Sequence, residues 1–283
     1  MSSTGPKIYL LPNLMTAGNL FCGFAAVLRI IEGKLEGQIP PDVLTSAGFA
    51  AANAKYKEAI GFILGACVFD LLDGRLARLG GHESPFGREF DSLADVVSFG
   101  VAPALLAYDI VLHDFHNTGW LIAFFYLLCG VLRLARFNCV AADPALQSGA
   151  SKDFEGFPIP AAAGVIASLT LFMLWIEEGQ KTIGAWKFGL PALMIFLSIL
   201  MFSHVRYPSF KAVNWRTQRS LPAFVVLIAV LVVTAMNYQW MPAVLFVLFL
   251  LYGFVRPFVS KALRREIEDE DDEAEEPEKR DAA

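Results

Sequence analysis

The longest uncharged run in the chain extends from Ser220 to Val255. A transmembrane helix needs about 20 mostly apolar residues to cross a hydrocarbon layer of about 30 Å, so this run is too long for one span. The segment 237–242 contains Asn, Gln and Pro and predicts a turn in the middle of the run. We therefore expect two membrane-spanning helices here, at 220–236 and 239–256.

Six further stretches of similar character precede this run, at residues 14–31, 57–77, 92–112, 118–138, 158–176 and 188–204. Hydrophobic residues make up 55 % of the chain and charged residues only 18 %, and the mean hydropathy is +0.50. This composition excludes a disordered chain, and four cysteines are too few for a disulfide-stapled secreted domain. The sequence therefore predicts an all-α polytopic membrane protein with about eight transmembrane helices.

Lys and Arg residues gather in the connections after the second, fourth, sixth and eighth predicted spans. The connections after the third and seventh spans contain neither residue type. Because cytoplasmic connections carry an excess of Lys and Arg, we expect both termini and the Arg-rich connections on the cytoplasmic side.

The C-terminal segment 266–283 is strongly acidic, and a block of like charges is normally disordered and solvated. We divide the chain into four parts: an N-terminal juxtamembrane segment (1–13), a transmembrane core (14–212), two additional transmembrane helices (213–260) and a charged tail (261–283).

Four aspartates interrupt the apolar pattern where the second span ends and the third begins. Asp70 and Asp73 are three residues apart and Asp91 and Asp95 are four apart, so each pair shares one helix face. A charged Asp inside a bilayer costs at least about 2.5 kcal/mol, and four neighbouring carboxylates also repel one another. We expect two divalent cations, Mg²⁺ or Mn²⁺, among them, because these ions prefer carboxylate oxygen ligands.

Small residues and an arginine accompany the aspartates. Gly74 and Ala77 follow the first pair, and Gly87 opens the next helix, so a flat ligand can approach the backbone closely. Arg78 offers a planar fork of donors suited to phosphate. Together with the metal ions, these residues predict a site for a nucleotide diphosphate.

The segment from Asp70 to Asp95 has the pattern D-x-x-D-G-x-x-A-R-x8-G-x-x-x-D-x-x-x-D. This pattern resembles the signature of the CDP-alcohol phosphotransferase family, membrane enzymes of phospholipid synthesis. The resemblance implies a six-helix core with a metal site open to the cytoplasmic leaflet, cleavage of a CDP-linked donor with release of CMP, and a homodimer in a membrane such as the bacterial inner membrane. It also implies that the metal ligands are Asp70, Asp73, Asp91 and Asp95, that the catalytic general base is Asp95, and that the nucleotide and its diphosphate bind at Gly74, Ala77, Arg78 and Gly87.

Four segments outside the signature bear on the acceptor alcohol, at residues 11–23, 132–138, 154–162 and 206–211. In combination they resemble the phosphatidylserine synthases of this family, which implies CDP-diacylglycerol and L-serine as substrates. A guanidinium group binds a carboxylate in bidentate fashion, so the candidates for binding serine are Arg133, Arg136 and Arg206. Asn13 and Thr16 lie one turn apart and are candidates for lining the nucleotide pocket.

Alternatives remain open from the sequence alone. The arginines also fit the role of anchors that extend to the headgroups, and Asn13 and Thr16 also fit a helix cap. The acceptor could instead be glycerol 3-phosphate, inositol phosphate or choline, and intramembrane carboxylates also mark cation transporters. We expect direct displacement, because the chain has no evident covalent nucleophile, and we expect no nucleic acid partner.

Overall fold

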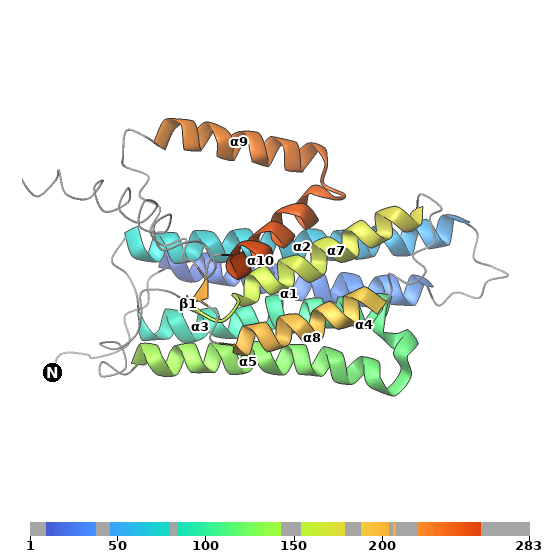
Figure 1. Cartoon of the computed structure of the whole chain (residues 1–283), viewed down its shortest axis with the longest axis horizontal. Coiled ribbons are helices and arrows are strands. Elements are labelled where there is room, and N and C mark those ends of the chain that lie inside the picture. Colours follow the sequence, from blue (N-terminus) through green and yellow to red (C-terminus); the bar gives the residue numbers. More distant parts are fainter. Residues whose placement is uncertain are drawn as a thin grey trace, which may run out of the picture.

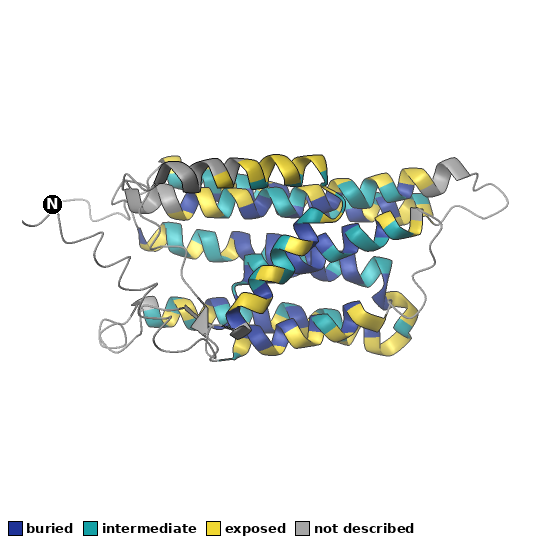
Figure 2. Cartoon of the chain, turned by 45° about the horizontal axis from the view of Figure 1, so that its top comes forward, coloured by how far each residue is buried: buried dark blue, intermediate teal, exposed yellow. Residues whose placement is uncertain are grey.

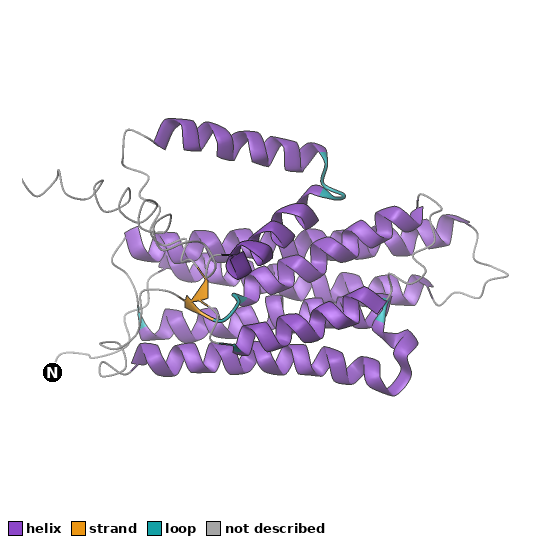
Figure 3. Ribbon diagram, in the orientation of Figure 1, coloured by secondary structure: helices purple, strands orange, loops and turns teal. Residues whose placement is uncertain are grey.

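The computed structural model describes residues 10–37, 46–79, 84–142, 154–178, 188–203, 206–207 and 220–255. These residues are almost entirely helical (Figures 1 and 3). The elements follow in the order α1 (Leu10–Gly37), α2 (Ser46–Leu79), α3 (Pro85–Asp95), the π-helix η1 (Val96–Val101), α4 (Ala102–Ile110), the 3₁₀ helix η2 (Leu112–Thr118), α5 (Gly119–Ala142), β1 (Phe154–Glu155), α7 (Ile159–Glu178), α8 (Gly189–Phe202), β2 (Arg206–Tyr207), α9 (Ser220–Met236) and α10 (Met241–Val255).

Each predicted span overlaps a helix of the described part of the chain, and residues 204 and 256, which end two of the spans, lie outside the described residues. Four helical stretches are long and apolar enough to cross a membrane, at Leu11–Gly37, Pro85–Ile110, Leu112–Val140 and Ile159–Glu177. Gly189–Phe202 and Met241–Gly253 are shorter apolar helices. The prediction of an all-α polytopic membrane protein is therefore confirmed. The predicted acidic tail, 261–283, lies outside the described residues.

The apolar span predicted at 92–112 is part of a longer helix, which begins at Pro85, two residues before the Gly87 that was expected to open it. The Ser84 hydroxyl accepts a hydrogen bond from the Gly87 amide at 3.0 Å, so Ser84 caps the helix. Pro85 follows in the first turn, where its missing N–H costs little. The first turn of this helix is polar and therefore lies outside the apolar run. Because the helix begins at Pro85, Asp91 lies well inside it.

The helical run from Pro85 to Ile110 widens into a π-helix, η1, directly after Asp95. The helix α1 packs tightly against this segment. A Cβ atom on Gly23 would lie 2.7 Å from the Cα of Ser98, so only glycine fits at this contact. The Ser98 hydroxyl donates a hydrogen bond of 2.9 Å to the Asn19 carbonyl. The contact therefore fixes α1 beside the end of α3.

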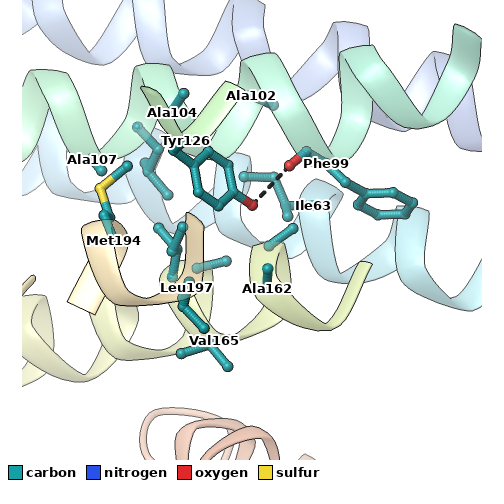
Figure 4. Packing of buried hydrophobic residues seen from close by; sticks show 14 of the residues in the cluster. Ile63, Phe99, Ala102, Ala104, Ala107, Tyr126, Ala162, Val165, Met194 and Leu197 are labelled. Carbon is teal, nitrogen blue, oxygen red and sulfur yellow. Dashed lines mark hydrogen bonds between the residues drawn. The ribbon is translucent and has the colours of Figure 1, made fainter. Parts of the chain in front are cut away.

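The interior of the bundle is apolar and closely packed (Figure 4). Tyr126 of α5 is fully buried, and its hydroxyl donates a hydrogen bond of 2.9 Å to the Phe99 carbonyl in η1. Met194 and Leu197 of α8 and Val165 of α7 belong to the same buried cluster. A buried phenol needs such a partner, and here it links α5 to the π-helix.

The outer faces of the helices carry many exposed large apolar side chains (Figure 2). On α5, for example, Leu121, Phe124 and Leu128 are all exposed. Such extensive apolar surface is unfavourable in water and is the surface that a protein presents to lipid.

Two connections that are distant in sequence meet in a short antiparallel strand pair. Phe154 of β1 lies opposite Tyr207 of β2, and Glu155 lies opposite Arg206. Gly156 follows β1 with a φ of +84°, and a Cβ there would collide with the Met201 carbonyl of α8. The chain therefore needs glycine to turn from β1 into α7.

A network of ion pairs lies at the end of the bundle opposite Asp70 and Asp95. Arg29 of α1 contacts Glu32 at 2.6 Å and Glu58 of α2 at 3.0 Å. Lys34 contacts Asp109 of α4 at 3.0 Å. These ion pairs join α1, α2 and α4 at the end of the bundle that is distant from Asp70 and Asp95.

The last two helices form a hairpin. The turn at 237–240 separates them, as the sequence predicts. Phe246 of α10 lies directly against Gly164 of α7, and its neighbour Phe249 packs on Phe157 with ring centroids 5.8 Å apart. In Figure 1, α9 stands away from the bundle while α10 crosses it, so α10 is the better anchored helix of the hairpin.

Candidate active site

Three aspartates converge where the C-terminal part of α2 meets α3, at the left in Figure 1. Asp70, Asp91 and Asp95 each offer a carboxylate oxygen, and these oxygens lie within 4.8 Å of one another. Asp95 is buried, and the other two are partly buried. We call this group the carboxylate cluster. Its all-oxygen donor set is one that could hold a divalent metal ion.

The fourth predicted ligand, Asp73, lies beside the cluster rather than within it. The Thr16 hydroxyl of α1 donates a hydrogen bond to Asp73 Oδ2. Asp73 is buried and interacts electrostatically with Asp70 and Asp91. The structure thus brings Thr16 to the predicted site and shows that α1 shares in building it.

A second side chain of α1 holds Asp95. The Asn19 amide donates a hydrogen bond of 3.0 Å to Asp95 Oδ1, and Asn19 is fully buried. Sequence reasoning did not assign Asn19 to the site. Asn13, Thr16 and Asn19 are spaced by three residues, however, and a polar face at that spacing in an apolar helix was the available signal.

An arginine of α5 faces the carboxylate cluster. Arg133 interacts electrostatically with Asp70 and Asp95, and Arg136 lies near enough to act on Arg133. Arg133 Nε and Asp91 Oδ1 are both buried, and neither has a hydrogen-bond partner among the described residues. A buried polar atom without a partner is costly, so both atoms point to groups that a ligand would supply.

Only some of the residues predicted to bind the nucleotide have side chains in the described part of the structure. At the start of α3, a Cβ atom on Gly87 would lie 3.4 Å from Asn13 Oδ1, so these two residues are neighbours. The Asn13 amide nitrogen is buried and has no hydrogen-bond partner among the described residues. Gly74 is exposed on α2. The side chains of Ala77, Arg78 and Arg206 lie outside the described part of the structure.

Sequence comparison places these residues in a known group of proteins. Residues 9–204 match the sequence model of the CDP-alcohol phosphatidyltransferase family. The chain is 33 % identical over 251 residues to a CDP-diacylglycerol–serine O-phosphatidyltransferase of Helicobacter pylori, which covers 88 % of this chain and 91 % of that protein. It is 36 % identical over 200 residues to the archaetidylserine synthase of Methanothermobacter thermautotrophicus (70 % and 69 % covered). It is also 39 % identical over 157 residues to a CDP-diacylglycerol–serine O-phosphatidyltransferase of Saccharomyces cerevisiae (55 % and 51 % covered). With the family match covering more than half of the chain and including both aspartate pairs, this protein belongs to the CDP-alcohol phosphatidyltransferase family.

Proposed function

We propose that this protein transfers the phosphatidyl group of CDP-diacylglycerol to the hydroxyl of L-serine, giving phosphatidylserine and CMP. The observation that carries the proposal is the convergence of Asp70, Asp91 and Asp95 within 4.8 Å at one end of an apolar helix bundle. Several relatives that cover most of this chain are named for the same reaction, which supports serine as the acceptor.

The carboxylate cluster fits divalent cations. Its donors are carboxylate oxygens, and Asp91 Oδ1 is buried without a partner among the described residues. We assign Asp70, Asp91 and Asp95, with the adjacent Asp73, as the residues that would hold two ions, Mg²⁺ or Mn²⁺. Bound there, such ions would neutralise the pyrophosphate of the donor and the charge that develops on departing CMP.

Asp95 is the proposed general base. The hydrogen bond from Asn19 fixes one of its carboxylate oxygens. Asp95 then takes the proton of the serine hydroxyl as the serine oxygen bonds to the phosphorus of the phosphatidyl group. The bond from that phosphorus to the CMP oxygen breaks in the same displacement, and CMP leaves with the bonding electrons.

The donor and acceptor pockets are proposed on either side of the cluster. Asn13 and Thr16 of α1, with Gly74 and Gly87, would line the cytidine and diphosphate site, to which Ala77 and Arg78 also belong by sequence. Arg133, whose buried Nε lacks a partner among the described residues, would bind the serine carboxylate together with Arg136. Arg206 is a further candidate, by sequence, for binding the serine carboxylate. Its backbone in β2 lies opposite Glu155 of β1.

We also propose how the protein sits in the membrane. The Arg-rich connections support an orientation with the carboxylate cluster and both termini on the cytoplasmic side. Serine and the nucleotide would then reach the site from the cytoplasm, and the acyl chains would remain in lipid. The catalytic core would comprise residues 14–212, with α9 and α10 outside it, and the working unit would be a homodimer.

The test is an assay of the purified protein with CDP-diacylglycerol, Mg²⁺ and labelled L-serine. The expected result is labelled phosphatidylserine with one CMP released per product formed, and loss of both on replacement of Asp91 by Ala. Incorporation of labelled glycerol 3-phosphate, inositol phosphate or choline in place of serine would contradict the proposed acceptor. Metal flux into vesicles without CMP release would contradict the enzymatic function itself.

A further inference from the structure

A hydrogen-bonded group of three polar residues joins α3 to α5, next to the carboxylate cluster. The Asn138 amide nitrogen donates to Glu89 Oε2 at 3.2 Å and to Ser92 Oγ at 3.0 Å. The Ser92 hydroxyl in turn donates a hydrogen bond of 3.2 Å to Asn138 Oδ1. We call these residues the Glu89 group. Asn138 thereby holds the Glu89 carboxylate at a fixed place, although that side chain is exposed.

The Glu89 group lies within reach of the proposed reaction centre. Glu89, Ser92 and Asp95 follow one another at intervals of three residues on α3, so Glu89 lies about 9 Å from Asp95 along the helix axis. Arg133 is on the same helix as Asn138 and interacts electrostatically with Asp95. A negative group, a positive group and the proposed base therefore belong to two helices, α3 and α5, that the Asn138 hydrogen bonds join.

We propose that Glu89, positioned by Asn138, binds the ammonium group of the acceptor amino acid. The inference rests on the proposed function and extends it from the reaction to the recognition of the acceptor. A free amino acid carries a carboxylate, an ammonium group and, in serine, a hydroxyl. Arg133, Glu89 and Asp95 offer one complementary partner to each of these groups.

The dimensions of serine agree with this arrangement. Its hydroxyl oxygen and its nitrogen are separated by three covalent bonds, and with one hydrogen bond at each end the molecule bridges about 9 Å. The backbone positions of Glu89 and Asp95 are about the same distance apart along the axis of α3, so a ligand of this length can extend from one residue to the other. Glu89 is also open to solvent, so a ligand that arrives from water can reach it.

The same charges disfavour the other acceptors. Glycerol 3-phosphate and inositol phosphate carry no cation to pair with Glu89, and their phosphate would be repelled by it. Choline carries a cation, but its quaternary nitrogen has no N–H to donate to a carboxylate and it has no carboxylate for Arg133. Glu89 is therefore a specificity-determining residue in this proposal.

The test variant is Glu89→Gln, because the amide oxygen of Gln still accepts from Asn138 while the negative charge is removed. A charge-assisted hydrogen bond contributes enough affinity for its loss to raise the KM for L-serine at least about tenfold. We expect kcat and the KM for CDP-diacylglycerol to stay within about twofold. With L-glycerate, which has a hydroxyl in place of the ammonium group at the same configuration, the variant should be no slower than the parent protein.

Glu177→Gln is the matched control, because Glu177 is an exposed acid at the other end of the bundle, near the end of α7. An unchanged KM for L-serine in Glu89→Gln would overturn the inference, since a purely structural link to Asn138 survives this substitution. An equal fall in the rates with L-serine and L-glycerate would overturn it as well. A parent protein that turns over another alcohol but not serine would instead refute the proposed function, so the two failures are distinguishable.

Discussion

The four aspartates have different surroundings, although the sequence presents them as two similar pairs. Thr16 bonds Asp73, and Asn19 bonds Asp95, so α1 supplies a donor to one member of each pair. Asp91 keeps a buried oxygen without a partner among the described residues. The neighbours of the carboxylates therefore suit them to different roles. The hydrogen bond from Asn19 orients Asp95, whereas Asp91 has an oxygen available to a cation.

Replacing Asp95 by Asn tests its role as the base. The amide keeps the size of the side chain and can still accept from Asn19, but it cannot take a proton. We expect kcat to fall about 10³-fold, within the range of general-base catalysis, while binding of CDP-diacylglycerol stays largely intact. The measurement is CMP release alongside equilibrium binding of the labelled donor. Equal loss of turnover and binding would show that Asp95 acts only as a metal ligand.

Replacing Asn19 by Ala tests whether α1 positions the base. The substitution removes a hydrogen bond to a charged group, which contributes about 1.5–3 kcal/mol, so we expect kcat to fall at least about tenfold. The KM values for the two substrates should change little, because Asn19 is fully buried and bonds Asp95. Asn117→Ala, at an exposed amide in η2, is the control. If Asn19→Ala lowered only stability and left kcat unchanged, the positioning role would be wrong.

At the scale of single residues, sequence reasoning identified the acids and two of their partners, Thr16 and Arg133, but not the neutral residues Asn19, Ser92 and Asn138. The carboxylates are conspicuous because they are costly in an apolar segment. Asn19, Ser92 and Asn138 are neutral, and their importance depends on how three helices are rotated against one another. The amino-acid pattern of one helix does not determine that rotation.

Among the elements, α1 has the largest effect on the site. It contacts α2 at Asp73, α3 at Asp95 and η1 at Ser98. The close approach at Gly23 makes the last of these contacts possible. The fit of this one helix therefore controls the relative placement of both aspartate pairs.

Gly23→Ala should loosen that fit. The added methyl group would overlap Ser98, and overpacking of this kind costs about 1–3 kcal/mol, so we expect a lower melting temperature in detergent and a lower kcat. Gly61→Ala on α2 is the matched control, because no described atom lies within 4 Å of a Cβ at Gly61. A variant as stable as Gly61→Ala would show that α1 shifts without penalty.

The start and end of the helices were predicted unevenly. Composition located the apolar middle of every span, because about 20 apolar residues leave little choice. The start of α3 at Pro85 lies two residues before the predicted start at Gly87, because the Ser84 cap and Pro85 in the first turn set where the helix begins. The π-helix after Asp95 was also missed, because it reflects packing against α1 and α5 and has no evident sequence signal.

The whole molecule separates its charges into two ends with an apolar interior between them. At one end, the ion pairs of Arg29, Lys34 and Asp109 are already matched. At the other end, the three carboxylates of the cluster lie within 4.8 Å of one another and interact with Arg133, so among the described side chains the cluster itself carries an excess of negative charge. The excess implies that the bundle is more stable when a divalent cation is present.

Thermal unfolding without substrate measures this dependence. An ion that binds only the folded protein stabilises it by about 2.7 kcal/mol at a concentration of 100 times its Kd, so Mg²⁺ should raise the melting temperature and excess chelator should reverse the gain. Asp91→Ala should melt higher than the parent protein in chelator, because one repelling charge is gone, and should gain little from Mg²⁺. Asp114→Ala, at an exposed acid in η2, should respond like the parent protein. Equal gains in all three proteins would place the ion elsewhere.

The chain order of the site also affects how the protein is made. Asn19 and all four aspartates fall within residues 13–95, whereas Arg133 lies on the later helix α5. A ribosome that synthesises this protein therefore delivers all four aspartates to the insertion machinery before Arg133 exists. During that interval the counter-charge has to come from outside α5, from Arg78 in the same segment or from a divalent ion present during translation.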